Sequence, residues 1–400
     1  MINKSDKQSF FKLLKNAHIF APEDLGVKDV LIAGEKIAAI GENLTLPAMY
    51  GCEEYDCSGC LLVPGFIDSH VHIIGGGGEG GFATRTPEIQ LSSITTSGVT
   101  TVAGLMGTDG ITRHVESVLA KARGLEDEGI SAYIYSGSYE IPTPTITGSV
   151  RRDIVLIDKV IGTGEIAMCD HRSSQSPKEE YRKLTAEARV GGMLSGKAGV
   201  VNMHMGDGAD GTKMLYEITA NGEIPRTQII PTHANRNKML FAQCIEWAKQ
   251  GGLMDVTSGV SPASGSAKSV KPSSAVKQAL DAGVEIRYIS MSSDGNGSMP
   301  IFDEDGNNIG VGVADQKSML SEFRDMVQVE KISLTDALRT VTSNVAKNLK
   351  LAPKKGFIAA DSDADMLLLD SNLQLKDVWA RGRHMVSGGK AIVFGTFEKR

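Results

Sequence analysis

The segment PGFIDSHVH, residues 64–72, combines a short apolar strand with two histidines one residue apart. Side chains alternate between the two faces of a strand, so His70 and His72 point to the same side. Two imidazoles on one face at the end of a strand supply half of a metal site. A single H-x-H is common by chance, so the rest of the chain decides what this pair does.

An alternation of strands and helices begins with this segment and continues to about residue 350. Apolar runs typical of strands recur, with stretches of helical period between them. The runs are residues 66–73, 99–105, 131–137, 165–170, 199–204, 227–233, 253–258 and 285–294. This alternation predicts a parallel sheet, and eight units predict a (β/α)₈ TIM barrel. An open, doubly wound sheet is also compatible with the alternation alone.

The two ends of the chain differ from this middle. Residues 14–62, and again the segment that begins at residue 355, read as short alternating strands separated by glycine and polar turns. We therefore expect residues 1–63 and 355–400 to join into one small β-sandwich domain. Residues 64–354 are then the barrel.

Charge and composition restrict the partners and the location. The 400 residues include 42 Lys and Arg against 48 Asp and Glu, a net charge of −6, without long blocks of one sign. We expect neither a nucleic-acid nor a membrane partner. The first twenty residues lack the apolar run of a signal peptide, and no stretch has membrane-spanning length. Five cysteines are a sparse, odd set, which favours reduced thiols and a cytoplasmic location.

Three later side chains close predicted barrel strands. His204 ends GVVNMH, His233 ends TQIIPTH and Asp294 ends EIRYISMSSD. Barrel enzymes carry their chemistry at the C-terminal ends of the strands. We therefore expect these three side chains to meet His70 and His72 in one pocket.

This set of strand ends resembles the pattern of the amidohydrolase superfamily. Further segments are similar, in the same order and across nearly the whole chain, to the bacterial isoaspartyl dipeptidases. They are IIGGGGEGGFATRTPE, GLMGTDG, CDHRSS, HMGDG, PTHANRN and SSDGNGS. The resemblance implies metal-dependent hydrolysis of the isopeptide bond of β-aspartyl dipeptides by a homo-oligomeric enzyme.

The resemblance also implies a site for two divalent metal ions, usually zinc. One ion would be held by His70, His72 and Asp294, and the other by His204 and His233. A hydroxide would bridge the two ions. Asp294 would accept its proton and deliver it to the departing amine, as general base and then general acid.

The sequence departs from the family at the bridging ligand. The family commonly uses a carbamylated lysine on the fourth strand, whereas this chain has Glu165 at the equivalent position and no lysine in that strand. A carboxylate and a carbamate are both monoanions with two oxygens. The glutamate side chain is shorter, so its backbone must lie closer to the ions. Glu165 is the predicted bridge, and Asp170 is the alternative.

The matched segments imply a set of substrate-binding residues. The glycine-rich loop 75–81 is not a P-loop because no GK[ST] follows it, and its glycines would let the backbone approach a ligand closely. The carboxylate of Glu79 on this loop suits an α-ammonium, and the phenol of Tyr139 would stabilise the oxyanion. Arg172 and Arg236 can each form a bidentate pair with a carboxylate. The implied set is Gly77, Gly78, Glu79, Thr108, Tyr139, Arg172, Arg236 and Ser298.

Other functions remain as alternatives. A dihydroorotase- or hydantoinase-like cyclic amidase, or an N-acyl-amino-acid deacylase, needs no site for a free ammonium, so Glu79 discriminates against them. A non-catalytic barrel scaffold is disfavoured because all the expected histidines and Asp294 are present. A serine hydrolase is disfavoured because no G-x-S-x-G occurs.

Overall fold

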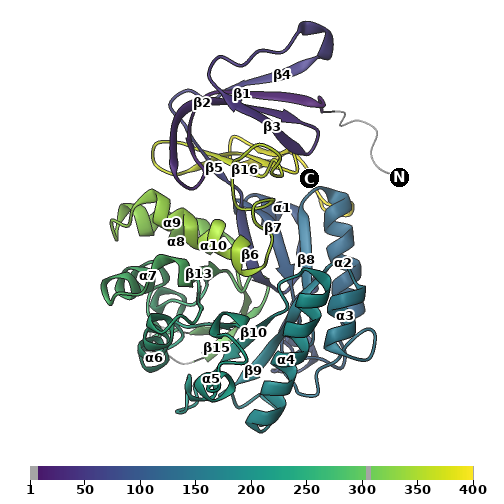
Figure 1. Ribbon diagram of the computed structural model, residues 1–400, viewed down its shortest axis with the longest axis vertical. Coiled ribbons are helices and arrows are strands. Elements are labelled where there is room, and N and C mark those ends of the chain that lie inside the picture. The colour runs from purple at the N-terminus through teal and green to yellow at the C-terminus, as the bar shows by residue number, and fades with distance from the viewer. Residues whose placement is uncertain (1–7, 303–307, 400) are drawn as a thin grey trace.

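The computed structural model describes residues 8–302 and 308–399. A barrel of parallel strands forms the lower part of the molecule in Figure 1, and a mixed sheet built from both ends of the chain lies above it. The predicted fold class is confirmed.

The barrel wall consists of two groups of parallel strands. Six strands form one sheet in the order β11-β10-β9-β8-β7-β6, and β12 pairs with β13. A parallel bridge between Val71 and Gly295 joins the end of β6 to the segment after β13, and Ala234 N after β11 donates to the Asp255 oxygen of β12 (3.0 Å). The two groups therefore meet at both edges, which excludes an open doubly wound sheet. The strands are β6 (Phe66–Val71), β7 (Val99–Gly104), β8 (Ser131–Ser136), β9 (Val160–Met168), β10 (Val200–Met205), β11 (Ile229–Thr232), β12 (Met254–Thr257) and β13 (Ile289–Ser292).

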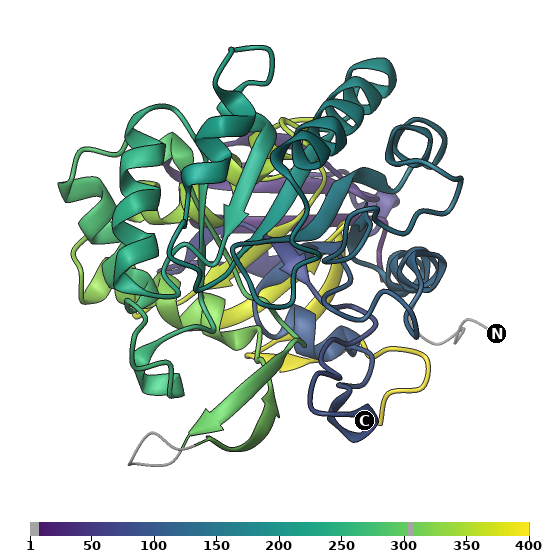
Figure 2. The same cartoon turned by 90° about the horizontal axis from the view of Figure 1, so that it is seen from below.

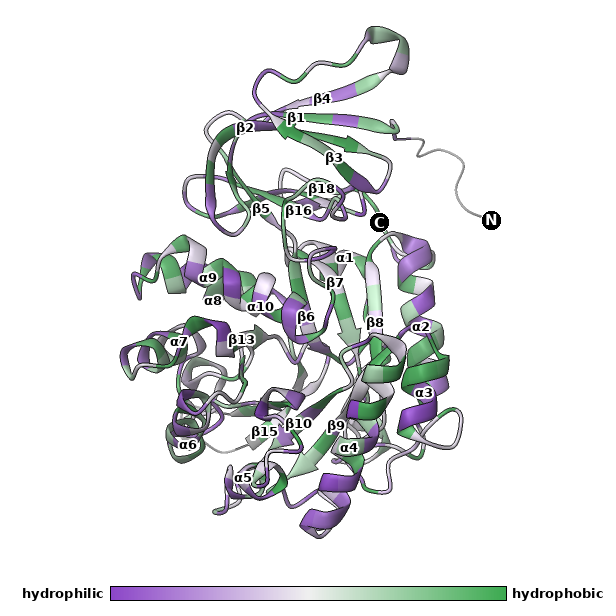
Figure 3. Ribbon diagram, in the orientation of Figure 1, coloured by the Kyte–Doolittle hydropathy of each residue, from purple (hydrophilic) through white to green (hydrophobic). Residues whose placement is uncertain are grey.

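Helices cover the outside of the strands and leave almost every strand residue buried. Helix α2 illustrates the cause: Val115, Val118, Ala122 and Leu125 form its buried face, and Gly129 ends it in the left-handed conformation. Figure 3 shows apolar residues concentrated on the strands that these helices enclose. The helices are α1 (Leu91–Thr95), α2 (Val115–Glu128), α3 (Val150–Leu156), α4 (Lys178–Ser195), α5 (Lys213–Thr219), α6 (Lys238–Lys249), α7 (Pro272–Asp281), α8 (Lys317–Gln328), α9 (Leu334–Val341) and α10 (Ser343–Asn348).

The mixed sheet has nine strands from the two chain ends. Its order is β19-β18-β17-β16-β5-β1-β2-β3, with β4 paired to β1. The strands are β1 (Phe11–Phe20), β2 (Asp24–Ala33), β3 (Lys36–Gly41), β4 (Cys52–Asp56), β5 (Leu61–Pro64), β16 (Met366–Leu369), β17 (Leu375–Ala380), β18 (Arg383–Ser387) and β19 (Lys390–Ala391). Leu14, Ile32, Leu62 and Trp379 are part of its own apolar core. The domain boundaries given above stay a prediction.

The sheet lies at the end of the barrel where β6 begins, because β5 leads directly into β6. The C-terminal ends of the barrel strands therefore face away from it, toward the viewer in Figure 2. A hairpin that the sequence analysis did not predict projects from this end, formed by β14 (Ser298–Phe302) and β15 (Asn308–Val313). None of the helices that the structure describes is long and apolar enough to span a membrane.

Lys355 joins the barrel to the mixed sheet. Its buried ammonium donates to Ser131 Oγ at the start of β8 (2.5 Å) and to Asp365 Oδ2 (2.5 Å), and it lies 2.7 Å from Asp363 Oδ2. Burial lowers the pKa of Lys355, but the charges of Asp365 and Asp363 outweigh burial and raise it. Burial likewise opposes ionisation of Asp363, but the charge of Lys355 holds the pKa of that carboxyl below its usual value.

We predict that Lys355→Met lowers the free energy of unfolding at pH 7 by about 3–5 kcal/mol, because removing the ammonium leaves buried carboxylates unpaired. Denaturant titration measures the loss. Lys354→Met is the matched control, since Lys354 lies 3.8 Å from the same Asp363 carboxylate but is 58% exposed. The control should change stability by about 1 kcal/mol or less. Equal losses in the two variants would contradict the assignment.

The sign of the pH dependence follows from the same shifts. Because the pKa of Asp363 is lowered by folding, this carboxyl stabilises the fold at pH values above 3.8, its ordinary pKa. This stability is lost as the pH falls through the pKa of the folded state. Because the pKa of Lys355 is raised by folding, this ammonium stabilises the fold at pH values below 10.5, its ordinary pKa. This stability is lost as the pH rises through the pKa of the folded state. The difference between wild type and Lys355→Met should therefore be largest near neutral pH and shrink at both extremes.

Candidate metal centre

Side chains from five barrel strands meet at the C-terminal end of the barrel. They are His70 on β6 and His72 just after it, Glu165 on β9, His204 on β10, His233 after β11 and Asp294 after β13. Three overlapping groups of them each bring three ligand atoms within 4.8 Å of one another. The structure thus places all the predicted ligands together.

Glu165 lies at the centre of this ligand cluster, the six side chains just named. Its Oε1 is 2.5 Å from His204 Nδ1 and 3.0 Å from His233 Nε2. Its Oε2 is 3.4 Å from His70 Nε2 and 4.0 Å from His72 Nε2. The two oxygens therefore face two separate pairs of imidazoles, which is the arrangement of a bridging carboxylate.

A bulge in β9 places the Glu165 side chain. Gly164 and Glu165 both lie opposite the single residue Asn202 of β10, so the ladder carries an extra residue here. Gly164 has a φ of +148°, and a Cβ on it would lie 2.7 Å from the Asn202 carbonyl oxygen. Only glycine fits this close approach, and the bulge turns the shorter glutamate toward the imidazoles.

Asp294 completes the ligand cluster on the side of the first histidine pair. Its Oδ1 is 3.0 Å from His72 Nε2 and 3.5 Å from His70 Nε2. Burial opposes its ionisation, but the adjacent imidazoles of His70 and His72 hold the pKa of the carboxyl well below its usual range. Asp294 is therefore an anion at neutral pH.

The electrostatics of the cluster favour a cation. Burial opposes ionisation of Glu165 too, but the charges of His70 and His204 hold its pKa well below the usual value. Burial lowers the pKa of His233 to about 4, so its ring is neutral at pH 7. Burial also lowers the pKa of His70, but the Glu165 charge outweighs this effect and raises it well above 6.5. The two carboxylates thus draw positive charge into the cluster.

The buried lone pairs of the cluster fit metal ions. His70 Nε2, Glu165 Oε2 and Asp294 Oδ1 have no hydrogen-bond partner among the residues that the structure describes. Unpaired buried polar atoms are costly, and native proteins rarely leave several together. Imidazole nitrogens and carboxylate oxygens are ligands of divalent cations such as zinc. The residues present therefore fit a binuclear metal site.

Predicted substrate-binding side chains line the same end of the barrel. Glu79 Oε1 accepts hydrogen bonds from Thr108 Oγ1 (2.7 Å) and Arg172 Nη1 (3.1 Å). Arg172 Nη2 and Arg236 Nη1 lie 3.1 and 3.0 Å from His204 Nε2. Two guanidinium groups thus stand beside a predicted metal ligand, and the Glu79 carboxylate is paired with one of them.

Tyr139 is equally close to this ligand. Its hydroxyl lies 2.8 Å from His204 Nδ1. Burial raises the pKa of Tyr139 well above 10, so the phenol keeps its proton at neutral pH. It is therefore available as a hydrogen-bond donor at the metal centre.

The glycine-rich loop packs against the segment that follows Asp294. Gly77 has a φ of +72°, and a Cβ on it would lie 2.6 Å from the Thr84 carbonyl oxygen and 2.8 Å from Ser298 Cβ. Gly78 also has a positive φ, of +110°. These glycines allow the tight loop that presents Glu79, while their contacts with substrate stay a prediction.

Sequence reasoning missed a buried carboxylate that supports the ligands. Asp68 accepts hydrogen bonds from the backbone nitrogens of His70 (3.3 Å) and Ser293 (3.1 Å) and from Gln316 Nε2 (2.9 Å). It ties β6 to the residue before Asp294. The period of two that places His70 and His72 on one face includes Asp68, so this signal was present in the sequence.

The structure distinguishes between Glu165 and Asp170, the two candidate bridging ligands. Asp170 Oδ2 is 3.0 Å from Nε2 of His204, whereas Glu165 faces the other ring nitrogen. Asp170 also belongs to none of the candidate ligand groups found among the described residues. The geometry therefore favours Glu165 as the bridge.

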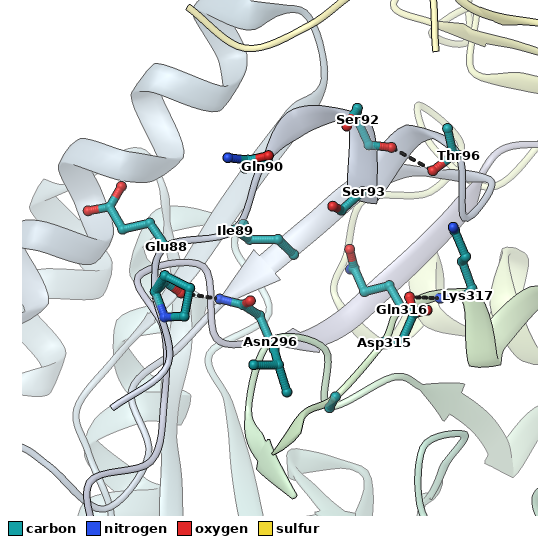
Figure 4. Close-up of a pocket in the computed structure, with 13 residues that line it drawn as sticks. Glu88, Ile89, Gln90, Ser92, Ser93, Thr96, Asn296, Asp315, Gln316 and Lys317 are labelled. Carbon is teal, nitrogen blue, oxygen red and sulfur yellow. Dashed lines mark hydrogen bonds between the residues drawn. The ribbon is translucent and has the colours of Figure 1, made fainter. Parts of the chain in front are cut away.

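A cavity of about 540 Å³ lies between residues 87–96 and 313–317. Figure 4 shows Asn296 and Gln316 on its wall. Asn296 donates to the carbonyls of His72 (3.0 Å) and Pro87 (2.7 Å), and Gln316 donates to Asp68. None of the six cluster residues lines the cavity, so it is separate from the metal centre.

Comparisons with known proteins agree with this geometry. Residues 61–398 match the model of the amidohydrolase family. The crystal structure of β-aspartyl dipeptidase from Fervidobacterium islandicum AW-1, in complex with a β-Asp-Leu dipeptide, is 44% identical in sequence with a TM-score of 0.87. The match covers 96% of this chain and 98% of that one.

Curated relatives are more distant. The D-hydantoinase of Geobacillus stearothermophilus is 25% identical over 97% of this chain and 88% of its own length. The dihydroorotase of Lactobacillus leichmannii is 38% identical over 106 residues, which are 26% of this chain and 23% of that protein.

We predict that Glu165→Gln weakens metal binding by at least about 10–100-fold, because the amide keeps the shape but loses the charge that faces both histidine pairs. The measurement is metal content per chain by elemental analysis after dialysis against a weak chelator. His114→Gln, at an exposed histidine just before α2, is the control and should retain the wild-type content. Two ions retained by Glu165→Gln would remove this residue from the bridge.

Proposed function

Because the chain belongs to the amidohydrolase family, we propose that it hydrolyses the isopeptide bond of β-aspartyl dipeptides. The observation that carries the proposal is the placement of Arg172 and Arg236 beside His204 of the ligand cluster, with Glu79 paired to Arg172. A β-aspartyl dipeptide has an α-ammonium, an α-carboxylate next to it and a second carboxylate at its far end. One acid and two arginines complement these charges.

The ligand cluster would hold two divalent cations, zinc in this proposal. His70, His72 and Asp294 would bind one, His204 and His233 the other, and Glu165 both. When bound, such a pair polarises the scissile carbonyl and lowers the pKa of a water molecule enough to supply the nucleophile. The remaining steps belong to side chains of this chain.

Asp294 moves the proton in this proposal. It is ionised, and its carboxylate stands beside His72 at the edge of the cluster. A carboxylate in this position accepts the proton of the attacking water and returns it to the departing amine. A fifth histidine in the cluster would not combine a permanent negative charge with this role.

Tyr139 stabilises the negative charge that develops on the carbonyl oxygen. Its phenol is protonated and lies at the cluster, 2.8 Å from His204. Preorganised donors of this kind lower the barrier because they need no reorientation during the reaction. Glu79 binds the α-ammonium, and the arginines bind the carboxylates.

A cyclic amidase is the second candidate, since relatives named D-hydantoinase and dihydroorotase match the chain. Glu79 argues against it, because such a substrate has no free ammonium to pair with this carboxylate. One assay separates the two functions: turnover of β-Asp-Leu, Asp-Leu and dihydroorotate, with metal content measured in parallel. We expect turnover of β-Asp-Leu alone. Turnover of dihydroorotate alone would overturn the proposal.

The homo-oligomer and the cytoplasmic location stay predictions.

We predict that Asp294→Asn lowers kcat by about 10²–10⁴-fold, because the amide cannot take the proton. The asparagine oxygen can still bind the cation beside His70 and His72, so metal should remain bound. Steady-state kinetics and elemental analysis of the same sample test both parts. A near-normal kcat in a metal-loaded variant would refute the proton-transfer role.

We predict that Glu79→Gln raises KM for β-Asp-Leu by about tenfold or more, the size expected for a lost charged hydrogen bond. Metal content should not change, since Glu79 contacts Thr108 and Arg172 and no predicted ligand. N-acetylated β-Asp-Leu supplies the complementary test. If wild type cleaves it as well as the free dipeptide, Glu79 does not bind the ammonium.

A further inference from the structure

Asp170 is a buried carboxylate that the proposed function does not use. It follows β9, and its side chain is 3% exposed. Its side chain accepts hydrogen bonds from Arg172 and lies within hydrogen-bond distance of His204, while the exposed His171 lies farther away, at 3.6 Å. Arg172 is a predicted substrate-binding residue and His204 a predicted metal ligand.

Asp170 fixes the orientation of Arg172. Its Oδ1 accepts from the backbone nitrogen (2.8 Å) and Nε (2.9 Å) of Arg172, and its Oδ2 accepts from Nη2 (2.9 Å). This paired contact is the fork geometry that holds a planar guanidinium in one direction. Nη1 remains free of Asp170 and points to Glu79 at 3.1 Å. The direction in which Arg172 meets a substrate carboxylate thus depends on Asp170.

Asp170 also controls the ring of His204. Nδ1 of this ring faces Glu165 at 2.5 Å and the Tyr139 hydroxyl at 2.8 Å, on the side of the ligand cluster, so Nδ1 would be its ligand atom. A neutral imidazole that gives the Nδ1 lone pair to a cation must carry its proton on Nε2, and that N–H needs an acceptor.

Among the described residues, three groups lie within hydrogen-bond distance of His204 Nε2, and one of them is an acceptor. Arg172 Nη2 lies at 3.1 Å, Arg236 Nη1 at 3.0 Å and Asp170 Oδ2 at 3.0 Å. Guanidinium groups have no acceptor atom. Asp170 Oδ2 is therefore the acceptor that matches the metal-binding form of His204.

The same oxygen, Asp170 Oδ2, thus receives both Arg172 Nη2 and His204 Nε2. We propose that Asp170 is a positioning residue that sets His204 for metal binding and Arg172 for substrate binding, so that both functions depend on one carboxylate. The substrate half rests on the proposed dipeptidase function, whereas the metal half does not.

The loop around Asp170 is anchored independently of its side chain. Gln175 Nε2 donates to the Asp170 backbone oxygen at 2.9 Å. Asp170→Asn keeps the shape and this anchor, while it removes the charge and replaces one acceptor oxygen with an NH₂ donor. It is therefore the variant of choice.

The first measurement uses metal-free protein and no substrate. Competition with a chromophoric chelator gives the dissociation constants of Zn²⁺ for wild type and for Asp170→Asn. We expect the variant to bind Zn²⁺ about 10–100-fold more weakly, as for other partners of metal-binding histidines. Binding within about twofold of wild type would overturn the metal half. Asp210→Asn, on the neighbouring loop with a side chain 74% exposed, is the control and should bind Zn²⁺ as wild type does.

The second measurement is kinetic, with Zn²⁺ at saturation. Asp170→Asn should raise KM for β-Asp-Leu about tenfold, with a smaller change in kcat, because a charged hydrogen bond that orients Arg172 is lost. Arg172→Met should raise KM as well but leave Zn²⁺ affinity unchanged. In the double variant KM should equal that of Arg172→Met, since Asp170 acts on substrate through Arg172.

The outcomes are separable. Additive KM effects in the double variant would overturn the substrate half, because they would show that Asp170 acts independently of Arg172. If Asp170→Asn does not fold, Arg172→Met carries the test: a loss of Zn²⁺ affinity in that variant would contradict the division of roles. If wild type cleaves no β-aspartyl dipeptide, the proposed function fails, and the Zn²⁺ measurement still decides the metal half.

Discussion

The carboxylate of Glu165 must face two pairs of imidazoles at once, and the rest of the metal centre depends on this constraint. One oxygen lies within 3.0 Å of His233 and closer still to His204, while the other faces His70 and His72. Four strands have to end at matching heights for this to occur. The barrel provides this because adjacent parallel strands hold their carboxyl ends at one rim. The bulge at Gly164 then makes the local correction that a side chain as short as glutamate needs.

The convergence of the ligands at this rim requires strained backbone, whereas paired charges connect the opposite end of the barrel to the mixed sheet. His233 and Asp294 have φ values of +62° and +56°, in a region that non-glycine residues rarely adopt. Such conformations cost about 1–3 kcal/mol each and persist only where the surroundings determine them. Asp68 supplies part of that determination, since it binds the backbone of both His70 and Ser293. At the other end, buried Lys355 joins β8 to the mixed sheet through paired charges.

Periodicity was sufficient to predict the barrel and the position of its ligands, because eight apolar runs separated by helices leave few alternatives. It predicted His204, His233 and Asp294 at the ends of their strands, and the structure has His204 on β10 with His233 and Asp294 just after β11 and β13. It could not place Glu165 securely, because a bulge is a property of two paired strands and β9 alone does not reveal it. The hairpin β14–β15 was missed for a related reason: its strands pair only with each other, outside the barrel period. The sequence indicates Asp170 only as a candidate metal ligand. That Asp170 faces Nε2 of His204 while Glu165 faces Nδ1 is visible only once the ring is placed in the structure.

Hydrogen-bond satisfaction, more than burial, separates the structural carboxylates from those suited to chemistry. Asp68 and Asp255 are completely buried, and both oxygens of each accept hydrogen bonds, those of Asp255 from Thr232, Ser290 and Ser292. These donors are neutral, so burial dominates and raises the pKa of both carboxyl groups. Glu165 is buried to the same degree, yet one of its oxygens has no hydrogen-bond partner among the described residues and imidazoles keep its pKa low. A buried anion that retains an unused lone pair is the group that a cation stabilises, and in this barrel such anions lie at the rim.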